Sequence, residues 1–481
     1  MIKSLSLAGL VLGANLSFAH AATMATGEGH SAVIRGDKSL WTWGNNDYGQ
    51  TGQGGSTGLK TPLQVGSDLF TDVACGAHHT VALDQNGNVW TWGHNSFGQL
   101  AVGDTTPQNV PTQISSPSDL PSTPVAVAAG DYSTYLLKFS GALYVAGRNN
   151  AGQLGLGNTT DQHHHVQIPF AQKISKIAAG PDFALAITAH GNLMSWGSNG
   201  FGQLGLGDKN QRNSPTQVGL DSDWVDVACG GSHVLALKSN GDLYAWGNDN
   251  FGQTGLGYKN SPDLLLSGVK FISAGREHSM VLKNGMALWS KGRSQVGQLG
   301  RGLVNNGDGQ LGQIGGNDWF SVVTGRYHNL ALKADGQLYA WGQNALGQTA
   351  TGNNKIEKNP QPVMIAVDPF PSVQVSPVKN VTSGENISLS TMAAGSGSLT
   401  TNWEVVAGPG GTTTLSYNGV TTQFYAGIPG TYTLMATVSN GTNPSQQSIT
   451  VHIHAAVFGK MKWGVNSWNA GEVASQDLRA R

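Results

Sequence analysis

Histidine is the residue type whose recurrence along this chain most suggests chemistry. Five histidines occupy one position of a repeated segment, where Ser133 and Phe183 stand in two other copies: His30, His79, His233, His278 and His328. A ring of imidazoles could bind a metal ion or exchange protons. A position that also accepts Ser and Phe is better explained by packing, so we predict a structural role for these five side chains.

The other catalytic patterns lack the context that their chemistry needs. His163, His164 and His165 form a cluster in the loop after the third Gly-Gln pair, without the cysteines or carboxylates that would complete a metal site. The GGSTG string at 54–58 matches a nucleophile elbow but lies in a polar loop. The GDGQLG string at 307–312 matches a dinucleotide fingerprint but no helix follows it. We therefore expect no catalytic residue, no cofactor, no bound metal and no enzymatic activity.

The elements that position the histidines are repeated seven times. Each copy contains a Trp-Gly or related pair, then in most copies Asn, then Gly-Gln, as in WGNNDYGQTG from Trp43 and WGNDNFGQTG from Trp246. The first and last Gly-Gln pairs start at Gly49 and Gly347, so six steps cover 298 residues. A period of about 50 residues indicates a repeat architecture, in which the repeated residues mostly form the scaffold.

One repeat is consistent with about four antiparallel strands. In the fifth copy these are SPTQV at 214–218, WVDVACG at 224–230, HVLALK at 233–238 and DLYAWG at 242–247, with a primed hairpin turn predicted at Asn240-Gly241. The strands are apolar on both faces, which is typical of a sheet between two other sheets. A radial stack of such sheets is a β-propeller with one blade per repeat. We predict an all-β chain: a seven-bladed propeller followed by a small β-sandwich.

Three further expectations concern how the blades fit together. The spare strand NPQPVMI at 359–365 is expected to complete the first blade and close the ring. The aromatic residues before four of the Gly-Gln pairs are expected to plug the space between blades: Tyr48, Phe97, Phe201 and Phe251. The Gln side chain of each pair is expected to fix the backbone of its loop.

The repeat resembles that of a known family. The pattern V-A-C-G-x-x-H-x-x-x-L, followed by G-x-L-Y-x-W-G-x-N-x-x-G-Q-L-G, is similar to the regulator-of-chromosome-condensation repeat and covers residues 24–366. This resemblance implies a seven-bladed propeller that acts by binding proteins. The founding member of the family is a nuclear guanine-nucleotide exchange factor. We do not expect that activity here, because the chain carries an export signal and has no obvious long insertion to act as a nucleotide-releasing wedge. The secreted propeller-type β-lactamase inhibitory protein is a closer functional analogy.

The candidate binding residues lie between the Gly that ends each first strand and the recurrent histidine. A propeller places all seven of these turns on one face, and the resemblance implies that this ring contacts the partner. The frame repeats while these residues vary, and they include Tyr and Arg, which are enriched at binding hot spots. The alternative is that they are tolerant, solvated turn residues. The candidates are Glu28, His78, Asp131, Tyr132, Asp182, Ser232, Arg276, Glu277, Arg326 and Tyr327.

Composition and the N-terminus place the chain among exported proteins. Lys3, the apolar run 5–18 and Ala19-His20-Ala21 predict a signal peptide over 1–21, with cleavage after Ala21 and a periplasmic or extracellular destination. No membrane span is expected. The net charge is −1 and no basic stripe occurs, so we expect no nucleic-acid partner. Cys75 and Cys229 hold equivalent positions three repeats apart, too far for a disulfide, and are predicted to be buried free thiols.

We divide the mature chain into a propeller at 22–367, an Ig-like β-sandwich at 368–456 and a tail at 457–481. The segment GTYTLMATVSNG resembles the late strands of polycystic-kidney-disease-type domains, and Trp403 is expected in a central strand. The tail is predicted to be disordered or a truncated module, and KWGVNSWNAGEVA is similar to the start of small chitin-binding domains. We expect a monomeric, non-catalytic protein-binding propeller. The alternative is a cell-wall or polysaccharide-associated adhesion protein.

Overall fold

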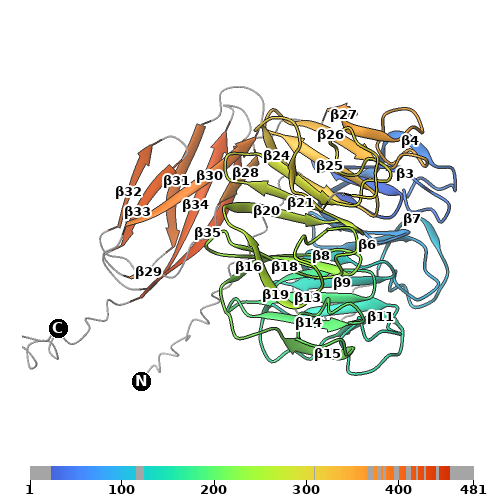
Figure 1. Cartoon of the computed structure of the whole chain (residues 1–481), viewed down its shortest axis with the longest axis horizontal. Helices are drawn as coiled ribbons and strands as arrows, with labels where there is room; N and C mark the ends of the chain where they lie inside the picture. Colours follow the sequence, from blue (N-terminus) through green and yellow to red (C-terminus); the bar gives the residue numbers. More distant parts are fainter. Residues whose placement is uncertain are drawn as a thin grey trace, which may run out of the picture.

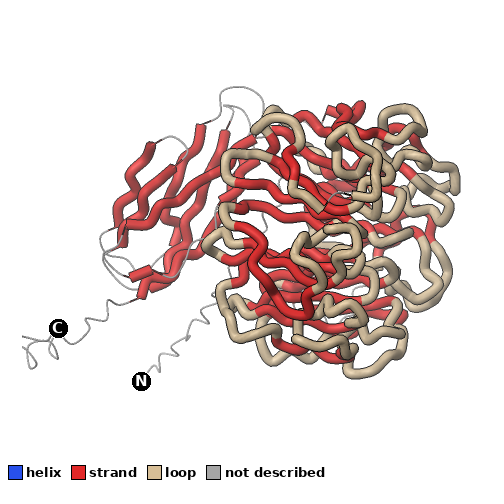
Figure 2. Tube along the Cα trace, viewed as in Figure 1, coloured by secondary structure: helices blue, strands red, loops and turns tan. Residues whose placement is uncertain are grey.

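The computed structural model describes residues 23–114, 124–307 and 309–366, together with the backbone of the strands between 372 and 454. In this part of the chain every regular element is a β-strand, and loops join them (Figure 2). None of these residues belongs to a helix long and apolar enough to cross a membrane. The predicted all-β class is confirmed, whereas the predicted signal peptide and tail lie outside the described residues.

Strands β1–β27 form seven antiparallel four-stranded blades, which follow one another around the ring (Figure 1). The first blade contains β1 (Met24–Thr26), β2 (His30–Ile34), β3 (Ser39–Gly44) and the first part of β4 (Leu59–Cys75). The second contains the rest of β4, β5 (His79–Asp84), β6 (Val89–Gly93) and β7 (Gln108–Gln113). Because β4 pairs with β3 up to Leu69 and with β5 from Phe70, it joins these two blades into one seven-stranded sheet.

The remaining five blades each take four consecutive strands. The third has β8 (Pro124–Ala129), β9 (Ser133–Lys138), β10 (Leu143–Gly147) and β11 (Gln162–Gln167), and the fourth has β12 (Ile174–Ala179), β13 (Phe183–Thr188), β14 (Leu193–Gly197) and β15 (Arg212–Gln217). The fifth has β16 (Trp224–Cys229), β17 (His233–Lys238), β18 (Leu243–Gly247) and β19 (Lys259–Leu266). The sixth has β20 (Val269–Ala274), β21 (His278–Lys283), β22 (Leu288–Gly292) and β23 (Gly312–Gln313), and the seventh has β24 (Trp319–Thr324), β25 (His328–Lys333), β26 (Gln337–Gly342) and β27 (Glu357–Ala366).

The ring does not close in the way that the sequence suggested. The spare strand lies in β27, which pairs with β26 of the last blade and not with the first blade. The segment at 214–218 likewise lies mostly in β15 and pairs with β14 of the preceding blade. The prediction was wrong because the fourth strand of each blade follows the Gly-Gln loop of its own repeat. The first blade therefore builds its sheet from β1–β4, and closure depends on packing between whole blades.

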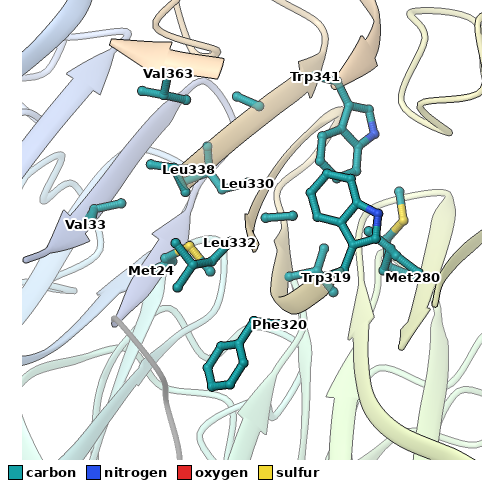
Figure 3. Packing of buried hydrophobic residues seen from close by; sticks show 14 of the residues in the cluster. Met24, Val33, Met280, Trp319, Phe320, Leu330, Leu332, Leu338, Trp341 and Val363 are labelled. Atoms are coloured by element: carbon teal, nitrogen blue, oxygen red, sulfur yellow. The ribbon is translucent and has the colours of Figure 1, made fainter. Parts of the chain in front are cut away.

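Apolar packing joins the first blade to the last (Figure 3). Met24 and Val33 of the first blade are buried in one cluster with Leu330, Leu332 and Leu338 of the seventh. The same cluster continues into the sixth blade through Met280 and Leu288. In Figure 1 the blue N-terminal strands lie beside the orange strands of the last blade. The hydrophobic effect, worth roughly 25 cal/mol per Å² of buried apolar surface, therefore holds the two ends of the ring together.

The five recurrent histidines form hydrogen bonds between neighbouring blades, which confirms their structural role. Each ring is fully buried, and its Nε2 lies 2.7–3.1 Å from an oxygen of the residue that follows the histidine position in the next blade. The pairs are His30 with Thr80, His79 with Thr134, His233 with Ser279, His278 with Asn329, and His328 with Ser31. The last pair joins the seventh blade to the first.

The two copies without histidine also lack its partner. Ser133 of the third blade is followed by Ala184 in the fourth, and Phe183 of the fourth blade is followed by Val234 in the fifth. Ala184 and Val234 have no side-chain hydrogen-bonding group. Donor and acceptor are therefore lost together, so no buried polar atom is left unpaired at these two interfaces, a loss that would cost about 1–3 kcal/mol.

The loop that contains the Gly-Gln pair forms a second set of hydrogen bonds between neighbouring blades. In all seven loops the Gln side-chain oxygen accepts a hydrogen bond from the amide two residues earlier, as Gln50 does from Tyr48 at 2.9 Å. This confirms the predicted role of the Gln side chain. The Gln50 main-chain oxygen accepts from the Trp92 indole and from Thr80 of the next blade, at 2.9 and 2.8 Å.

The ring closes through the same contact at the last loop. The main-chain oxygen of Gln348 accepts from the Trp43 indole and the Ser31 hydroxyl at 2.9 and 3.1 Å. In the sixth copy, where Lys291 replaces Trp, its Nζ donates instead to the main-chain oxygen of Thr254.

Two local predictions need correction. The turn after β17 is a three-residue loop, because the Gly241 amide donates to the Lys238 carbonyl and only Gly241 has positive φ, at 85°. A primed two-residue turn would need positive φ at Asn240 as well. Two of the residues expected to plug the blades lie at the surface instead, Tyr48 at 43% and Phe201 at 40% exposure, and the other two, Phe97 and Phe251, are only half-buried. The buried indoles of the Trp-Gly pairs, such as Trp43, fill the space between blades.

The C-terminal segment contains eight strands in two four-stranded sheets. One has the order β28 (Ser372–Val375), β30 (Asn386–Ala394), β33 (Thr421–Ala426) and β32 (Thr413–Asn418). The other has the order β29 (Val381–Thr382), β35 (Pro444–His454), β34 (Gly430–Ser439) and β31 (Thr400–Ala407). Trp403 lies in β31, which ends its sheet and is not the central strand that we expected. The Ig-like assignment stays a prediction.

Replacing His233 by Phe, the residue at the equivalent position of the fourth blade, should reduce the acid sensitivity of the fold. Burial lowers the pKa of His233 to about 3, whereas in the unfolded chain it is about 6.5. Between these values the unfolded chain binds the extra proton, so stability is lost as the pH falls. In urea titrations, His233→Phe should lose less stability between about pH 6.5 and 4, by on the order of 2–3 kcal/mol.

At neutral pH the same variant should be about 1 kcal/mol less stable, because the bond to Ser279 is lost. His190→Gln is the matched control, since His190 is exposed and its loss should leave the pH dependence unchanged. Equal pH dependence of His233→Phe and the native chain would contradict this account.

Candidate functional site

The seven turns that carry the candidate residues meet at the centre of one face. Strand direction reverses at each step, so the turn between the first and second strands and the loop between the third and fourth lie at the same end of every blade. The first variable residue of each turn lines a central cavity of about 110 Å³. We call these residues the inner ring: Glu28, Ala77, Asp131, Pro181, Gly231, Arg276 and Arg326.

In the five blades that have the inter-blade histidine, the Gly before the variable pair is required by that ring. A Cβ on Gly230 would lie 2.2 Å from Cε1 of His233 and 2.6 Å from the carbonyl oxygen of Gly275 in the next blade. Contacts this short do not occur between real atoms, and backbone cannot move aside cheaply. The residues on both sides of the variable pair are thus constrained, while the identity of the pair itself can vary.

The second variable residue forms a middle ring, which is hydrogen-bonded to an outer one. Its carbonyl accepts from the amide of the residue after each Trp-Gly pair or its equivalent, at 2.7–2.9 Å. The middle ring consists of Gly29, His78, Tyr132, Asp182, Ser232, Glu277 and Tyr327, and the outer ring of Asn45, His94, Arg148, Ser198, Asn248, Arg293 and Gln343. These hydrogen bonds hold the two variable positions of each repeat side by side.

The structure brings several of the predicted residues together around the cavity. Arg326 forms an ion pair with Glu28, and the His78 Nε2 lies 3.7 Å from the same carboxylate. Burial lowers the pKa of His78 although Glu28 opposes the shift, so this ring is neutral at pH 7. Burial likewise raises the pKa of Asp131 to about 6, against the opposing effect of Arg276.

Other predicted residues form separate contacts. Glu277 pairs with Arg293 of the outer ring. An oxygen of Asp182 accepts from the Gln153 amide at 3.2 Å, and the Ser232 hydroxyl donates to the Gly231 carbonyl at 2.8 Å. The Arg326 guanidinium lies 5.5 Å from the centre of the Tyr327 ring. All ten predicted residues are half-buried, so none is a freely solvated turn side chain.

Aromatic side chains gather over the first three blades. We call this group the aromatic sector: Tyr48, His78, His94, Phe97, Tyr132 and Arg148. Neighbouring ring centres lie 4.8–6.4 Å apart, and the guanidinium of Arg148 lies 5.0 Å from the Phe97 ring and 5.8 Å from the Tyr132 ring. The fourth and fifth blades contribute no aromatic side chain to the three rings, and their Gly-Gln loops carry Phe201 and Phe251. Their six ring positions are Pro181, Asp182, Ser198, Gly231, Ser232 and Asn248. The types of side chain on this face therefore differ from one side of the propeller to the other.

Sequence reasoning missed four members of this sector. Tyr48 and Phe97 were assigned to the space between blades, and His94 and Arg148 were not considered. The residue after each Trp-Gly pair varies as much as the turn pairs do, and that variation was a usable signal. The proximity of these four residues to Tyr132 could not be predicted from the sequence, because it depends on how three separate repeats are placed around the ring.

The remaining candidates for chemistry lie elsewhere. Within the described residues no group of three or more His, Cys, Asp or Glu side chains is arranged to hold a metal ion. The triple histidine lies on strand β11 and not in a loop as predicted. His165 is directed inward and burial lowers its pKa to about 3, whereas His163 and His164 are exposed. Alternation along the strand puts His164 on the opposite face from His163 and His165, so the three rings do not converge on one point.

Cys75 and Cys229 are free thiols, as predicted, although they are half-buried rather than fully buried. Both line the central cavity at the ends of β4 and β16. Burial raises the pKa of the Cys75 thiol to about 12 and shifts that of Cys229 in the same direction.

These thiols should react slowly in the folded protein. Because the thiolate is the nucleophile, labelling by a disulfide reagent near pH 8 should be at least about a hundredfold slower than in concentrated guanidinium chloride. Unfolding without a reductant should release both thiols for titration. Fewer than two titrated thiols would contradict the free state, and fast labelling of the native chain would contradict the raised pKa.

The chain is similar to proteins with the same repeat. A family model described as the RCC1-like domain matches residues 10–233 and 115–390. The RCC2 homolog of Xenopus laevis is 26% identical over 161 residues, which are 32% of this chain and 21% of that protein. The ultraviolet-B receptor UVR8 of Arabidopsis thaliana is 30% identical over 170 residues, 34% of this chain and 38% of that protein. The chain thus spans well under half the length of these curated relatives.

Solved structures share the fold. Prp20p from Saccharomyces cerevisiae, described with its binding properties to Gsp1p and histones, has a TM-score of 0.63 and 23% identity, over 70% of this chain and 88% of that one. Human WBSCR16 has a TM-score of 0.62 and 23% identity, over 71% of this chain and 95% of that one. The family model covers well over half of the sequence, and the blades, loops and inter-blade bonds account for the match. The chain therefore belongs to the RCC1-like domain family.

Proposed function

We propose that this protein is an exported, non-catalytic binding protein that engages a macromolecular partner through the three rings on one face of its propeller. The observation that carries the proposal is the uneven chemistry of that face. Every blade has the same frame, yet a group of five rings in contact with one another, together with Arg148, lies over the first three blades, and charged side chains surround the central cavity. A solvated turn surface with no partner gives no reason for such an arrangement.

The types of residue on this face suit protein recognition. Tyr and Arg are enriched at interface hot spots, and stacked rings present a large contact area at low conformational cost. A relative of the same fold binds proteins: yeast Prp20p is described with its binding to Gsp1p and histones, and the same protein, yeast RCC1, was solved bound to Kap60. These partners belong to that protein. What supports the proposal here is the shared use of the fold for interaction.

Removing four ring side chains should abolish capture of the partner. The chain, used as bait in an extracellular or periplasmic fraction, is compared with a variant that carries Tyr132→Ala, Arg276→Ala, Arg326→Ala and Tyr327→Ala. Because hot-spot truncations each cost about 2 kcal/mol or more, recovery of the captured protein should fall at least about tenfold, as measured by quantitative mass spectrometry.

Leu220→Ala is the matched control, since Leu220 is 91% exposed and lies in a connection between blades, on the opposite face. It should capture as well as the native chain, and all variants should unfold at similar temperatures. Undiminished capture by the fourfold variant would refute the ring as the binding face. Sedimentation with chitin or peptidoglycan that survives the same substitutions would favour the polysaccharide alternative and place the function in the C-terminal segment.

Export can be tested independently of binding. Expressed in a bacterium, the chain should be recovered from the periplasm or medium with Ala22 as its first residue, by intact-mass and N-terminal analysis. Leu12→Arg places a charge in the apolar run of the predicted signal and should leave an uncleaved chain in the cytoplasm. Cytoplasmic recovery of the native chain with residues 1–21 retained would contradict the proposal.

A further inference from the structure

Asp131 is the carboxylate of the inner ring whose side chain has no partner. Among the described residues the structure gives its side chain no hydrogen bond or ion pair, while Glu28 is paired with Arg326 and Asp182 accepts a hydrogen bond from Gln153. Asp131 lines the central cavity and burial raises its pKa to about 6, so it is ionised above that pH and poorly solvated. A carboxylate in this state is stabilised by a cation that reaches it.

The charge around Asp131 favours a cation over an anion. The inner and middle rings together carry four carboxylates, Glu28, Asp131, Asp182 and Glu277, and two guanidinium groups, Arg276 and Arg326. His78 is neutral, because burial lowers its pKa. The outer ring adds two further cations: Arg293, which is paired with Glu277, and Arg148, which lies over the rings of Phe97 and Tyr132. The excess of negative charge is therefore confined to the inner and middle rings, which surround the cavity.

The aromatic sector lies immediately beside this carboxylate. Tyr132 follows Asp131 in the chain, and its ring lies 5.2 Å from Phe97 and 6.4 Å from His78, centre to centre. Tyr48, at the edge of the sector, is 43% exposed. A ligand that combines a compact positive charge with an apolar stem would contact both the carboxylate and the rings. A lysine side chain has this form, with four methylene groups below its ammonium.

We propose that Asp131 and the aromatic sector form a receptor for a lysine side chain that projects from a loop of the partner protein. The ammonium enters the central cavity at Asp131, and the stem and neighbouring apolar residues lie on Tyr132, Phe97 and Tyr48. The inference rests on the proposed function and names the chemistry of its partner. The cavity of about 110 Å³ has room for an ammonium group but not for a folded element.

Small isosteric probes test this site on the full-length protein. We would titrate 2-phenylethylammonium, 3-phenylpropanoate and 2-phenylethanol near pH 7.5, where Asp131 is ionised, and measure affinity by ligand-observed NMR. The ammonium probe should bind in the millimolar range, as expected for about nine heavy atoms, and at least about tenfold more tightly than the carboxylate probe. The alcohol should fall between them, since it contacts only the rings.

Two variants locate the binding. Asp131→Asn should weaken the ammonium probe at least about tenfold and leave the alcohol unchanged, whereas Tyr132→Ala should weaken both. Asp68→Asn is the matched control, because Asp68 is exposed and does not belong to the three rings. Both ring variants should unfold near the temperature of the native chain, since each removes a half-buried side chain at the end of a blade.

Three outcomes would overturn the inference: tighter binding of the carboxylate probe, which would make Arg276 the receptor; no binding of the ammonium probe; or ammonium binding that Asp131→Asn does not change. These outcomes are separable from failure of the proposed function. If the chain captures a partner through its ring face but does not bind the ammonium probe, the proposed binding function stands and the lysine receptor is refuted.

Discussion

The hydrogen bonds between neighbouring blades are the constraint on which the rest of this structure depends. A carbonyl oxygen of each Gly-Gln loop accepts from the Trp indole or the hydroxyl of the following blade, and in five interfaces a buried histidine extends the contact. These groups are buried, so leaving either member of a histidine–oxygen pair without the other would be costly. The chain avoids this cost, since Ala184 and Val234 accompany the two missing histidines.

This constraint also explains where variation is allowed. In five blades the Gly before the variable pair is fixed by the histidine ring and the next blade's backbone, and the histidine after the pair is fixed by its partner. The two residues between them contact the cavity, one another, the outer ring and the Gly-Gln loops, all at the surface of this face. Seven such pairs are brought to one face, together with the loops that bind the next blade. The scaffold thus presents a surface whose chemistry can change without disturbing the core.

That surface is not a uniform ring. Five rings in contact with one another and Arg148 lie over the first three blades, charges surround the central cavity, and the rings of the fourth and fifth blades hold no aromatic side chain. An off-centre partner would bury the aromatic sector and reach Asp131 at the same time. The half-buried thiols along the cavity and the buried histidines have pKa values shifted toward their neutral forms, so neither group carries charge at neutral pH.

The sequence by itself determined the number of blades, the position of each hairpin, the function of the Gly-Gln side chain and the ring of variable pairs, because all of these repeat with a fixed period. It misplaced the closing strand and the loop aromatics. The closing strand and the loop aromatics each lie beside a turn. The local pattern of residues does not say which blade the strand pairs with, or whether an aromatic side chain points between two blades or toward the surface. Only the tertiary structure decided that β27 stays with β26, and that Tyr48, His94 and Phe97 gather beside Tyr132. Such contacts join residues of different repeats, so they depend on the angle between blades and not on the order of residues within one.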